Sequence, residues 1–137
     1  MINQKKFDIL ESECSKCVMC SLSSTRNNVV FGRGNPNSSL FVIGEGPGQQ
    51  EDAQGLAFVG RAGKMLDSAF LSVGIDTNKD CYISNIVKCR PPNNRKPLAN
   101  EVKECMPWLN EQIELIKPKV IVLAGSTAVQ SYLDIDE

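Results

Sequence analysis

The sequence predicts an α/β fold in which a parallel sheet carries helices on its faces. Three short apolar runs, at 40–45, 81–87 and 119–125, have the β-branched content or terminal glycine of buried strands. Apolar residues at helical spacing follow each run. Strands that alternate with helices form parallel sheets. With 137 residues, 42 % of them apolar, the chain is expected to form one domain over 1–137.

Each expected element has its own pattern. The strands are LFVIGE (40–45), CYISNIV (81–87) and KVIVLAG (119–125), all expected to be buried. A second helix is expected over 98–116, after the loop KCRPPNNRKP, and a third over 126–133. The first helix closes at Gly74, and its apolar face contains Ala62, Met65, Leu66, Ala69, Phe70 and Val73.

Charge and hydropathy exclude some partners. The net charge is −1, so any contact with nucleic acid must come from a local basic patch. No apolar run approaches eighteen residues, and the N-terminus MINQKKFDILESE is too polar for a secretion signal. We therefore expect a cytoplasmic monomer without membrane association. In that reducing compartment, six cysteines indicate metal or redox chemistry more than disulfides.

The cysteines permit three readings. Cys14 and Cys17 form a C-x-x-C pair, whereas Cys89 and Cys105 stand fifteen residues apart. Because the chain has no histidine, a closed soft-metal site must be all thiolate, holding zinc or an iron-sulfur cluster. Zinc modules usually have two C-x-x-C pairs, and only one is clear here, which favours a cluster slightly. Reduced, buried cysteines without metal are the third reading, and the spacing alone leaves Cys20 undecided.

The unusual loops follow the first two strands. GEGPGQQEDAQGLAFVGRAG comes after the first strand, and NIVKCRPPNNRKP ends the second. In parallel sheets, ligands bind beyond the carboxyl ends of the strands. The sequence therefore predicts a ligand site at this edge of the sheet.

These motifs resemble a known family. GEGPGQQED, FVGRAGKMLD, NIVKCRPPNNR and ECMPWL are similar, in order and spacing, to the motifs of family 4 uracil-DNA glycosylases, iron-sulfur enzymes of bacteria and archaea. The resemblance covers nearly the whole chain. It implies a three-layer α/β/α sandwich with a parallel central sheet, and an enzyme of base excision repair that hydrolyses the N-glycosidic bond of uracil in DNA.

The resemblance also implies a cofactor. Four cysteines match the ligands of a 4Fe-4S cluster, and two others, Cys20 and Cys81, match none. Such a cluster would tie the N-terminal segment to the loop at 89–97, as a structural clip that presents cations to DNA phosphates. The matching ligands are Cys14, Cys17, Cys89 and Cys105, and the expected DNA-binding cations are Arg90, Arg95 and Lys96, with Lys88 and Lys103 as possible extensions.

Two residues match the recognition of the base. A glycosylase takes its target base out of the stack and holds it in a pocket. By the resemblance, Phe58 stacks on the flipped base, although a lone phenylalanine is more often core. Asn85 matches the base reader: its amide can donate to uracil O4 and accept from N3-H, whereas cytosine presents the opposite pattern. The alternative for Asn85 is a strand-end amide that bonds the backbone.

The first loop supplies the expected chemistry. Bond cleavage leaves positive charge on the sugar and negative charge on uracil. The resemblance assigns Glu45 to positioning or activating the attacking water. Gly46 and Gly48 allow their amides to approach the ligand closely, and Glu51 is a candidate pocket wall that disfavours the methyl group of thymine. A solvated acidic loop is the alternative for Glu51 and Asp52.

One feature of the family is missing. Family members carry a histidine motif after a fourth strand, whereas this sequence has no histidine and stops at SYLDIDE. The sandwich is thus expected without its C-terminal strand, and the chain is expected to be weak or inactive, as a fragment or a short homologue. The alternative function is a non-catalytic iron-sulfur module that binds DNA, related to phage-type polymerase-associated proteins. A zinc-binding nucleic-acid module is a third possibility.

Overall fold

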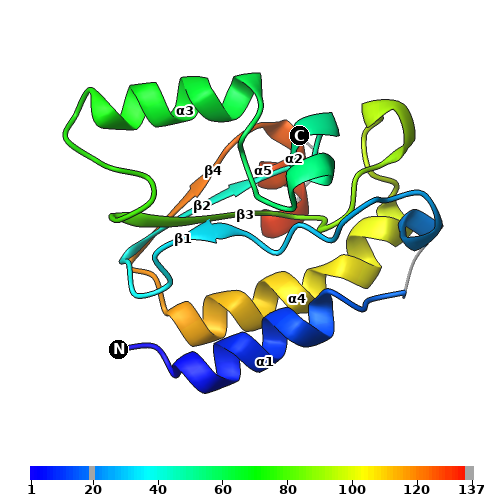
Figure 1. Ribbon diagram of the computed structural model, residues 1–137, viewed down its shortest axis with the longest axis horizontal. Helices are drawn as coiled ribbons and strands as arrows, with labels where there is room; N and C mark the ends of the chain where they lie inside the picture. Colours follow the sequence, from blue (N-terminus) through cyan, green and yellow to red (C-terminus); the bar gives the residue numbers. More distant parts are fainter. Residues whose placement is uncertain (19–20, 135–137) are drawn as a thin grey trace.

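A computed structural model describes residues 1–18 and 21–134, which form a sheet with helices on both faces (Figure 1). The strands stand in the order β1-β3-β2-β4. Along the chain the elements are α1 (Gln4–Cys14), η1 (Ser21–Ser24), β1 (Arg33–Gly34), β2 (Leu40–Gly44), α2 (Gln49–Gln54), α3 (Arg61–Leu71), β3 (Cys81–Asn85), η2 (Pro92–Asn94), α4 (Ala99–Ile116), β4 (Val120–Leu123) and α5 (Ser126–Leu133). The predicted strands and helices are all present.

The register of the sheet aligns the two strands that precede the unusual loops. β2 pairs in parallel with both β3 and β4, and Gly44 stands opposite Asn85. β1 is different, because it pairs antiparallel with β3 and places Arg33 opposite Ile83. The sheet is therefore mostly parallel, as predicted, with one short antiparallel edge strand that the sequence did not indicate. β1 is only two residues long, too short for a periodic pattern.

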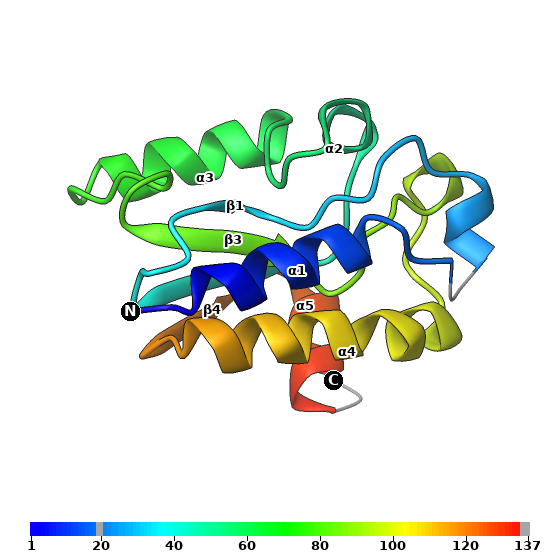
Figure 2. The same ribbon diagram turned by 60° about the horizontal axis from the view of Figure 1, so that its bottom comes forward.

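The helices form two layers. α1 and α4 lie side by side against one face of the sheet, and α2 and α3 lie on the other (Figures 1 and 2). α5 also belongs to the α1/α4 side, since Ala128 packs into the same hydrophobic cluster as those helices. Among the described residues, no helix has the length and apolar content to cross a membrane.

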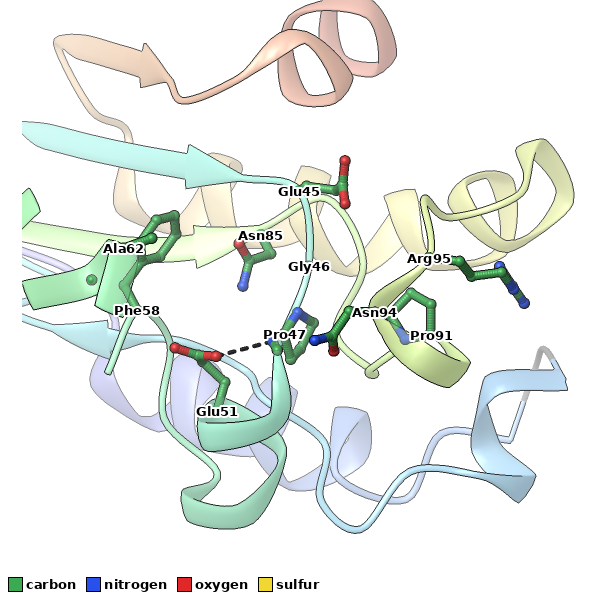
Figure 3. A pocket seen from close by; sticks show the side chains of 12 residues that line it. Glu45, Gly46, Pro47, Glu51, Phe58, Ala62, Asn85, Pro91, Asn94 and Arg95 are labelled. Carbon is green, nitrogen blue, oxygen red and sulfur yellow. Dashed lines mark hydrogen bonds between the residues drawn. The ribbon is translucent and has the colours of Figure 1, made fainter. Parts of the chain in front are cut away.

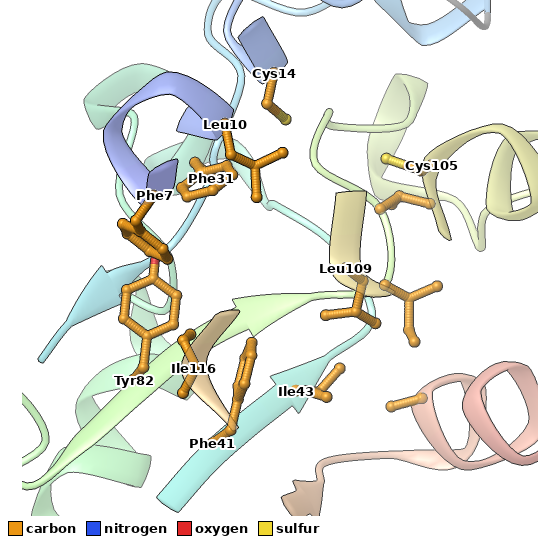
Figure 4. Packing of buried hydrophobic residues seen from close by; sticks show 13 residues of the cluster. Phe7, Leu10, Cys14, Phe31, Phe41, Ile43, Tyr82, Cys105, Leu109 and Ile116 are labelled. Carbon is orange, nitrogen blue, oxygen red and sulfur yellow. The ribbon is translucent and has the colours of Figure 1, made fainter. Parts of the chain in front are cut away.

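The larger core lies on the α1/α4 face of the sheet. Phe7, Phe31, Tyr82 and Phe41 meet edge to face, with ring centroids 5.4 to 5.5 Å apart (Figure 4). α1 contributes Phe7, Leu10 and Cys14, which are spaced three and four residues apart and all buried. This helix was not predicted, because polar residues surround those three positions.

The α3 face is packed more thinly. The helix forms as predicted, but its apolar face is only partly buried, since Met65 is 69 % exposed and Val73 is 72 % exposed. Leu66 and Phe70 pack, half-buried, against the strands, and Gly63 is the one fully buried residue of α3. β4 was expected to be buried, yet Val120 is 55 % exposed because β4 is an edge strand.

Candidate active site and cysteine cluster

A pocket opens at the carboxyl ends of β2 and β3, where the loops predicted it (Figure 3). Its volume is about 260 Å³, just below the range of pockets for drug-sized ligands. A single base-sized ring therefore has room in this pocket. The lining residues are Glu45, Gly46, Pro47, Gly48, Glu51, Phe58, Ala62, Gly63, Asn85, Pro91, Asn94 and Arg95.

Asn85 ends β3 and brings an amide to the pocket. The residue is only 1 % exposed, and its Oδ1 atom has no hydrogen-bond partner among the described residues. A buried polar atom without a partner costs about 1–3 kcal/mol, so native proteins rarely keep one without a use. The strand-end alternative, in which this amide bonds the backbone, does not describe its oxygen. The amide is available to a ligand with a complementary edge.

Phe58 lies beside Asn85, over the end of β2. A Cβ atom on Gly44 would overlap the Phe58 ring and would stand 2.7 Å from the Asn85 oxygen. The ring and the amide thus meet over a position that has room only for glycine. Phe58 has a φ of 53°, a conformation uncommon outside glycine. Its surroundings must therefore hold it in place.

The predicted catalytic carboxylate stands at the rim. Glu45 is half-buried and lines the pocket, and Figure 3 shows its carboxylate turned away from the Asn85 side chain. That carboxylate makes no hydrogen bond within the part of the chain that the structure describes. It is thus available to water. The neighbouring Gly46 is needed for packing, because a Cβ there would lie 2.6 Å from the side chain of Val87.

Glu51 organises the loop around the pocket. Its Oε1 accepts from the amide of Gly48 at 3.0 Å, and its Oε2 accepts from the amides of Val59 at 2.9 Å and Gly60 at 2.7 Å. A Cβ on Gly48 would lie 2.9 Å from this carboxylate. Asp52 is also engaged, since it is 1 % exposed and accepts from the amide of Asn27 at 2.8 Å. The solvated-loop alternative is wrong for both carboxylates.

The cations of the loop at 89–97 lie in different environments. Lys96 is exposed, and Arg90 is half-buried with its Nε donating to Asn94 Oδ1 at 2.7 Å. Arg95 instead forms a fork with the buried carboxylate of Glu101, with both N–O distances 2.8 Å. This pair lowers the pKa of Glu101 to about 2. The charge of Arg95 is therefore shared with a protein carboxylate.

At two residues of this region the structure differs from what the sequence predicted. Lys88 was expected as an extension of the basic patch, but it is 1 % exposed, so this expectation is wrong. Its ammonium donates to Ser84 Oγ at 2.8 Å and to the Asn85 carbonyl at 2.7 Å. Asn94 lines the pocket and was missed. Its position in the loop after β3 could have indicated a role in the pocket, because that loop follows Asn85 at the same end of the sheet.

The four cysteines singled out in the sequence gather at one place. Cys17, Cys89 and Cys105 line a single small cavity between the N-terminal segment, the loop after β3 and α4. Burial raises the pKa of the Cys14 thiol to about 12; Lys88 lowers it, and the other three cysteines raise it further. All four thiols therefore lie within electrostatic reach of one another. Cys81 is elsewhere, buried in β3 as a core residue, and Cys20 lies outside the described residues.

Nitrogen donors surround these sulfur atoms. The Lys88 amide lies 3.1 Å from Cys105 Sγ, Trp108 Nε1 lies 3.4 Å from Cys17 Sγ, and an Arg26 nitrogen lies 3.5 Å from Cys89 Sγ. Donors of this kind stabilise thiolates. Across the described residues, no three cysteine, aspartate or glutamate side chains are arranged to hold a single metal ion.

The fold and the pocket define an α/β protein whose ligand site lies at the ends of two parallel strands. The sequence profile of the uracil DNA glycosylase superfamily matches residues 31–136. The type-4 uracil-DNA glycosylase of Thermotoga maritima is 44 % identical over 131 residues, 96 % of this chain and 68 % of its own length. That of Archaeoglobus fulgidus is 43 % identical over 126 residues, 92 % of this chain and 63 % of its own.

The chain belongs to the uracil DNA glycosylase superfamily, in its type-4 family. A second kind of relative is also similar. A DNA polymerase of Bacillus phage SP01 is 33 % identical over 99 residues, which are 72 % of this chain and 11 % of the polymerase.

Proposed function

We propose that this chain recognises uracil in DNA and hydrolyses its N-glycosidic bond. The observation that carries the proposal is the unpartnered, buried Oδ1 of Asn85 beside the ring of Phe58, in a pocket with room for a single base. A glycosylase needs this combination because it reads the edge of a base taken out of the stack. The chain spans 68 % and 63 % of the length of two type-4 relatives. The activity in their names is therefore a proposal for this chain.

Recognition follows from hydrogen-bond polarity. The ring of Phe58 stacks on the extruded base. The Asn85 amide accepts from uracil N3-H through the oxygen that lacks a protein partner, and it donates to O4. Cytosine presents an acceptor and a donor in the reverse order, which leaves buried groups unpaired and is therefore rejected.

Bond cleavage needs a water and a stabilised sugar. As the glycosidic bond breaks, the sugar becomes positive and uracil becomes negative. The Glu45 carboxylate stands at the rim without a protein partner in the described chain, and we assign it to orienting the water and facing the developing positive charge. Gly48 and Glu51 keep the pocket wall in place, because the Glu51 carboxylate bonds three backbone amides.

The thiol cluster supports a 4Fe-4S cofactor held by Cys14, Cys17, Cys89 and Cys105. A single zinc ion requires all four sulfurs about 2.3 Å from one centre, and the described residues offer no such group. N–H donors to sulfur, such as the Lys88 amide and Trp108 Nε1, would suit an iron-sulfur cluster at these thiolates. When bound, it fastens the N-terminal segment to the loop after β3. That loop then presents Arg90 and Lys96, with part of the charge of Arg95, to DNA phosphates.

A second function is favoured by the phage polymerase relative. In this alternative the chain binds uracil-containing DNA without cleaving it. Both functions use the same pocket, so binding and excision must be measured separately.

The deciding experiment incubates anaerobically purified protein with a single strand that contains one uracil, and measures free uracil and strand binding. We expect weak excision, and we expect Asn85→Ala to lower it further, by at least about a hundredfold, because the reader supplies buried hydrogen bonds. Asn110→Ala, an exposed residue of α4, is the matched control and should act like the parent chain. Binding of uracil-containing DNA without excision would favour the second function. If the protein neither bound nor cleaved this DNA, both proposed functions would be refuted.

A further inference from the structure

Two oppositely charged side chains, Arg33 and Glu51, hold the backbone of the loop that carries Phe58. Its φ of 53° is in the left-handed region, where a phenylalanine is rare and must be held by its surroundings. A Cβ on Gly63 would overlap the Phe58 carbonyl, so the start of α3 packs directly on this peptide. The position of the ring is therefore set by contacts to its backbone.

Arg33, on the edge strand β1, provides the contacts on one side. Its Nε donates to the Ala57 carbonyl at 2.6 Å, and Nη2 donates to the Phe58 carbonyl at 2.9 Å. Nη2 also pairs with Asp67 of α3 at 2.8 Å. Nη1 donates to Thr77 Oγ1 at 3.1 Å and to Asn78 Oδ1 at 2.9 Å.

These contacts give the guanidinium five acceptors, which matches its five N–H groups. Its side chain is only 9 % exposed. A planar fork can hold two adjacent carbonyls and a carboxylate at once, whereas an ammonium group acts as a single point charge. The contacts of Arg33 thus fix the Phe58 loop to the sheet and to α3 together.

Glu51 provides the contacts on the other side. Its Oε2 accepts from the amides of Val59 and Gly60 at 2.9 and 2.7 Å. The arginine therefore binds the carbonyls of residues 57 and 58, and the glutamate binds the next two amides. The backbone on both sides of the Phe58 ring is held through charge-assisted hydrogen bonds, which are the strong kind.

We propose that Arg33 is a positioning residue that acts through Phe58, holding its ring at the stacking position over Gly44. The inference rests on the proposed function, because it assigns the ring to uracil binding. Arg33 itself lines no part of the pocket. Its effect on the ligand must therefore pass through the loop.

A double-mutant cycle tests this dependence. The affinity for free uracil is measured by NMR titration for the parent chain, Arg33→Lys, Phe58→Ala and the double variant. Arg33→Lys keeps a cation beside Asp67 but cannot hold both carbonyls. We expect it to weaken binding about tenfold, and we expect the same substitution to have no further effect once Phe58 is alanine. Arg61→Lys, an exposed arginine at the start of α3, is the matched control and should change nothing.

The outcomes separate this inference from the proposed function. Equal losses of uracil affinity from Arg33→Lys with and without the Phe58 ring would overturn the role of Arg33, because the effects of a general structural role are additive. An unchanged affinity in Arg33→Lys, with Phe58→Ala defective, would overturn it as well and leave the proposed function intact. Failure of the parent chain to bind uracil, or an unchanged affinity in Phe58→Ala, would overturn both. Should Arg33→Lys not fold, Asp67→Asn, which weakens the grip on the same guanidinium, replaces it in the cycle with the same expectations.

Discussion

The two faces of the sheet are built differently. On the α1/α4 face, α4 packs Leu109 and Ile116 into a core that also holds the rings of Phe7, Phe41 and Tyr82 (Figure 4). On the α3 face, the fully buried apolar residues come from the strands and loops, and α3 adds only half-buried side chains. Most of the buried apolar side chains of the described residues therefore lie on one side of the sheet.

The functional groups follow this division. The four cysteines lie on the densely packed side, where Cys14 and Cys105 are part of the core cluster itself. The stacking ring of Phe58 lies on the thin side, where polar contacts from Arg33 and Glu51 replace hydrophobic packing. One face of the sheet thus holds the fold together, and the other carries a loop adjusted to a ligand.

Removal of a cysteine ligand is expected to have the largest effect on the packed face. Cys89→Ser is expected to abolish iron binding and to lower the melting temperature by about 10 °C or more, because cluster binding is coupled to folding. Iron content, visible absorption and thermal unfolding measure this. Cys81→Ala is the control. Cys81 is buried in the hydrophobic core on the α3 face, so this variant should keep the iron. A colourless, iron-free parent chain would contradict the cofactor assignment.

A core truncation tests the packed face next. Leu109 is 0 % exposed within the α1/α4 cluster. Leu109→Ala should lower the free energy of unfolding by about 3 kcal/mol, since it removes buried surface and leaves a cavity. Urea unfolding followed by circular dichroism measures the change. A loss under about 1 kcal/mol would mean that this face is not the dense one.

The sequence was enough to predict the parts that depend on local pattern. β2 and β3 are short apolar runs and α4 is a long amphipathic pattern, and all three are found where predicted. The pocket was also found where predicted, because the ends of parallel strands share one edge of a sheet. Local pattern and topology were sufficient for both.

Features that depend on the folded arrangement could not be predicted from local pattern. The burial of Lys88 was missed because its partners, Ser84 and the Asn85 carbonyl, become available only when β3 enters the sheet. Arg33 stands in a two-residue strand with no periodicity, so its contacts to the Phe58 loop could not be foreseen. The gathering of the cysteines followed from the family resemblance, since spacing alone also allowed zinc or no metal.

A charge on the packed face gives a smaller, pH-dependent effect. Glu101 accepts from Arg95, from the Leu98 amide and from Ser21, and these bonds lower its pKa from 4.5 to about 2. Its ionised form thus stabilises the fold fully above about pH 4.5, and this contribution is lost as the pH falls toward 2. We expect Glu101→Gln to cost about 1–2 kcal/mol at pH 7.

The pH dependence of unfolding checks this assignment. The stability gap between the parent chain and Glu101→Gln should close between about pH 4.5 and pH 2. Glu111→Gln, on the exposed side of the same helix, is the control and should leave no such gap. A gap of constant size across this pH range would show that the carboxylate acts by shape and not by charge.

The smallest effect is expected on the α3 face. Leu66 is half-buried there, so Leu66→Ala should lower the free energy of unfolding by only about 1 kcal/mol. The same variant should weaken uracil binding measurably, because α3 carries Asp67, which pairs with Arg33 beside the Phe58 loop. Hydrogen exchange should find the amides of α3 opening before those of α4. If Leu66→Ala cost as much stability as Leu109→Ala and left uracil binding unchanged, the α3 face would be a second structural core and not a support for the ligand loop.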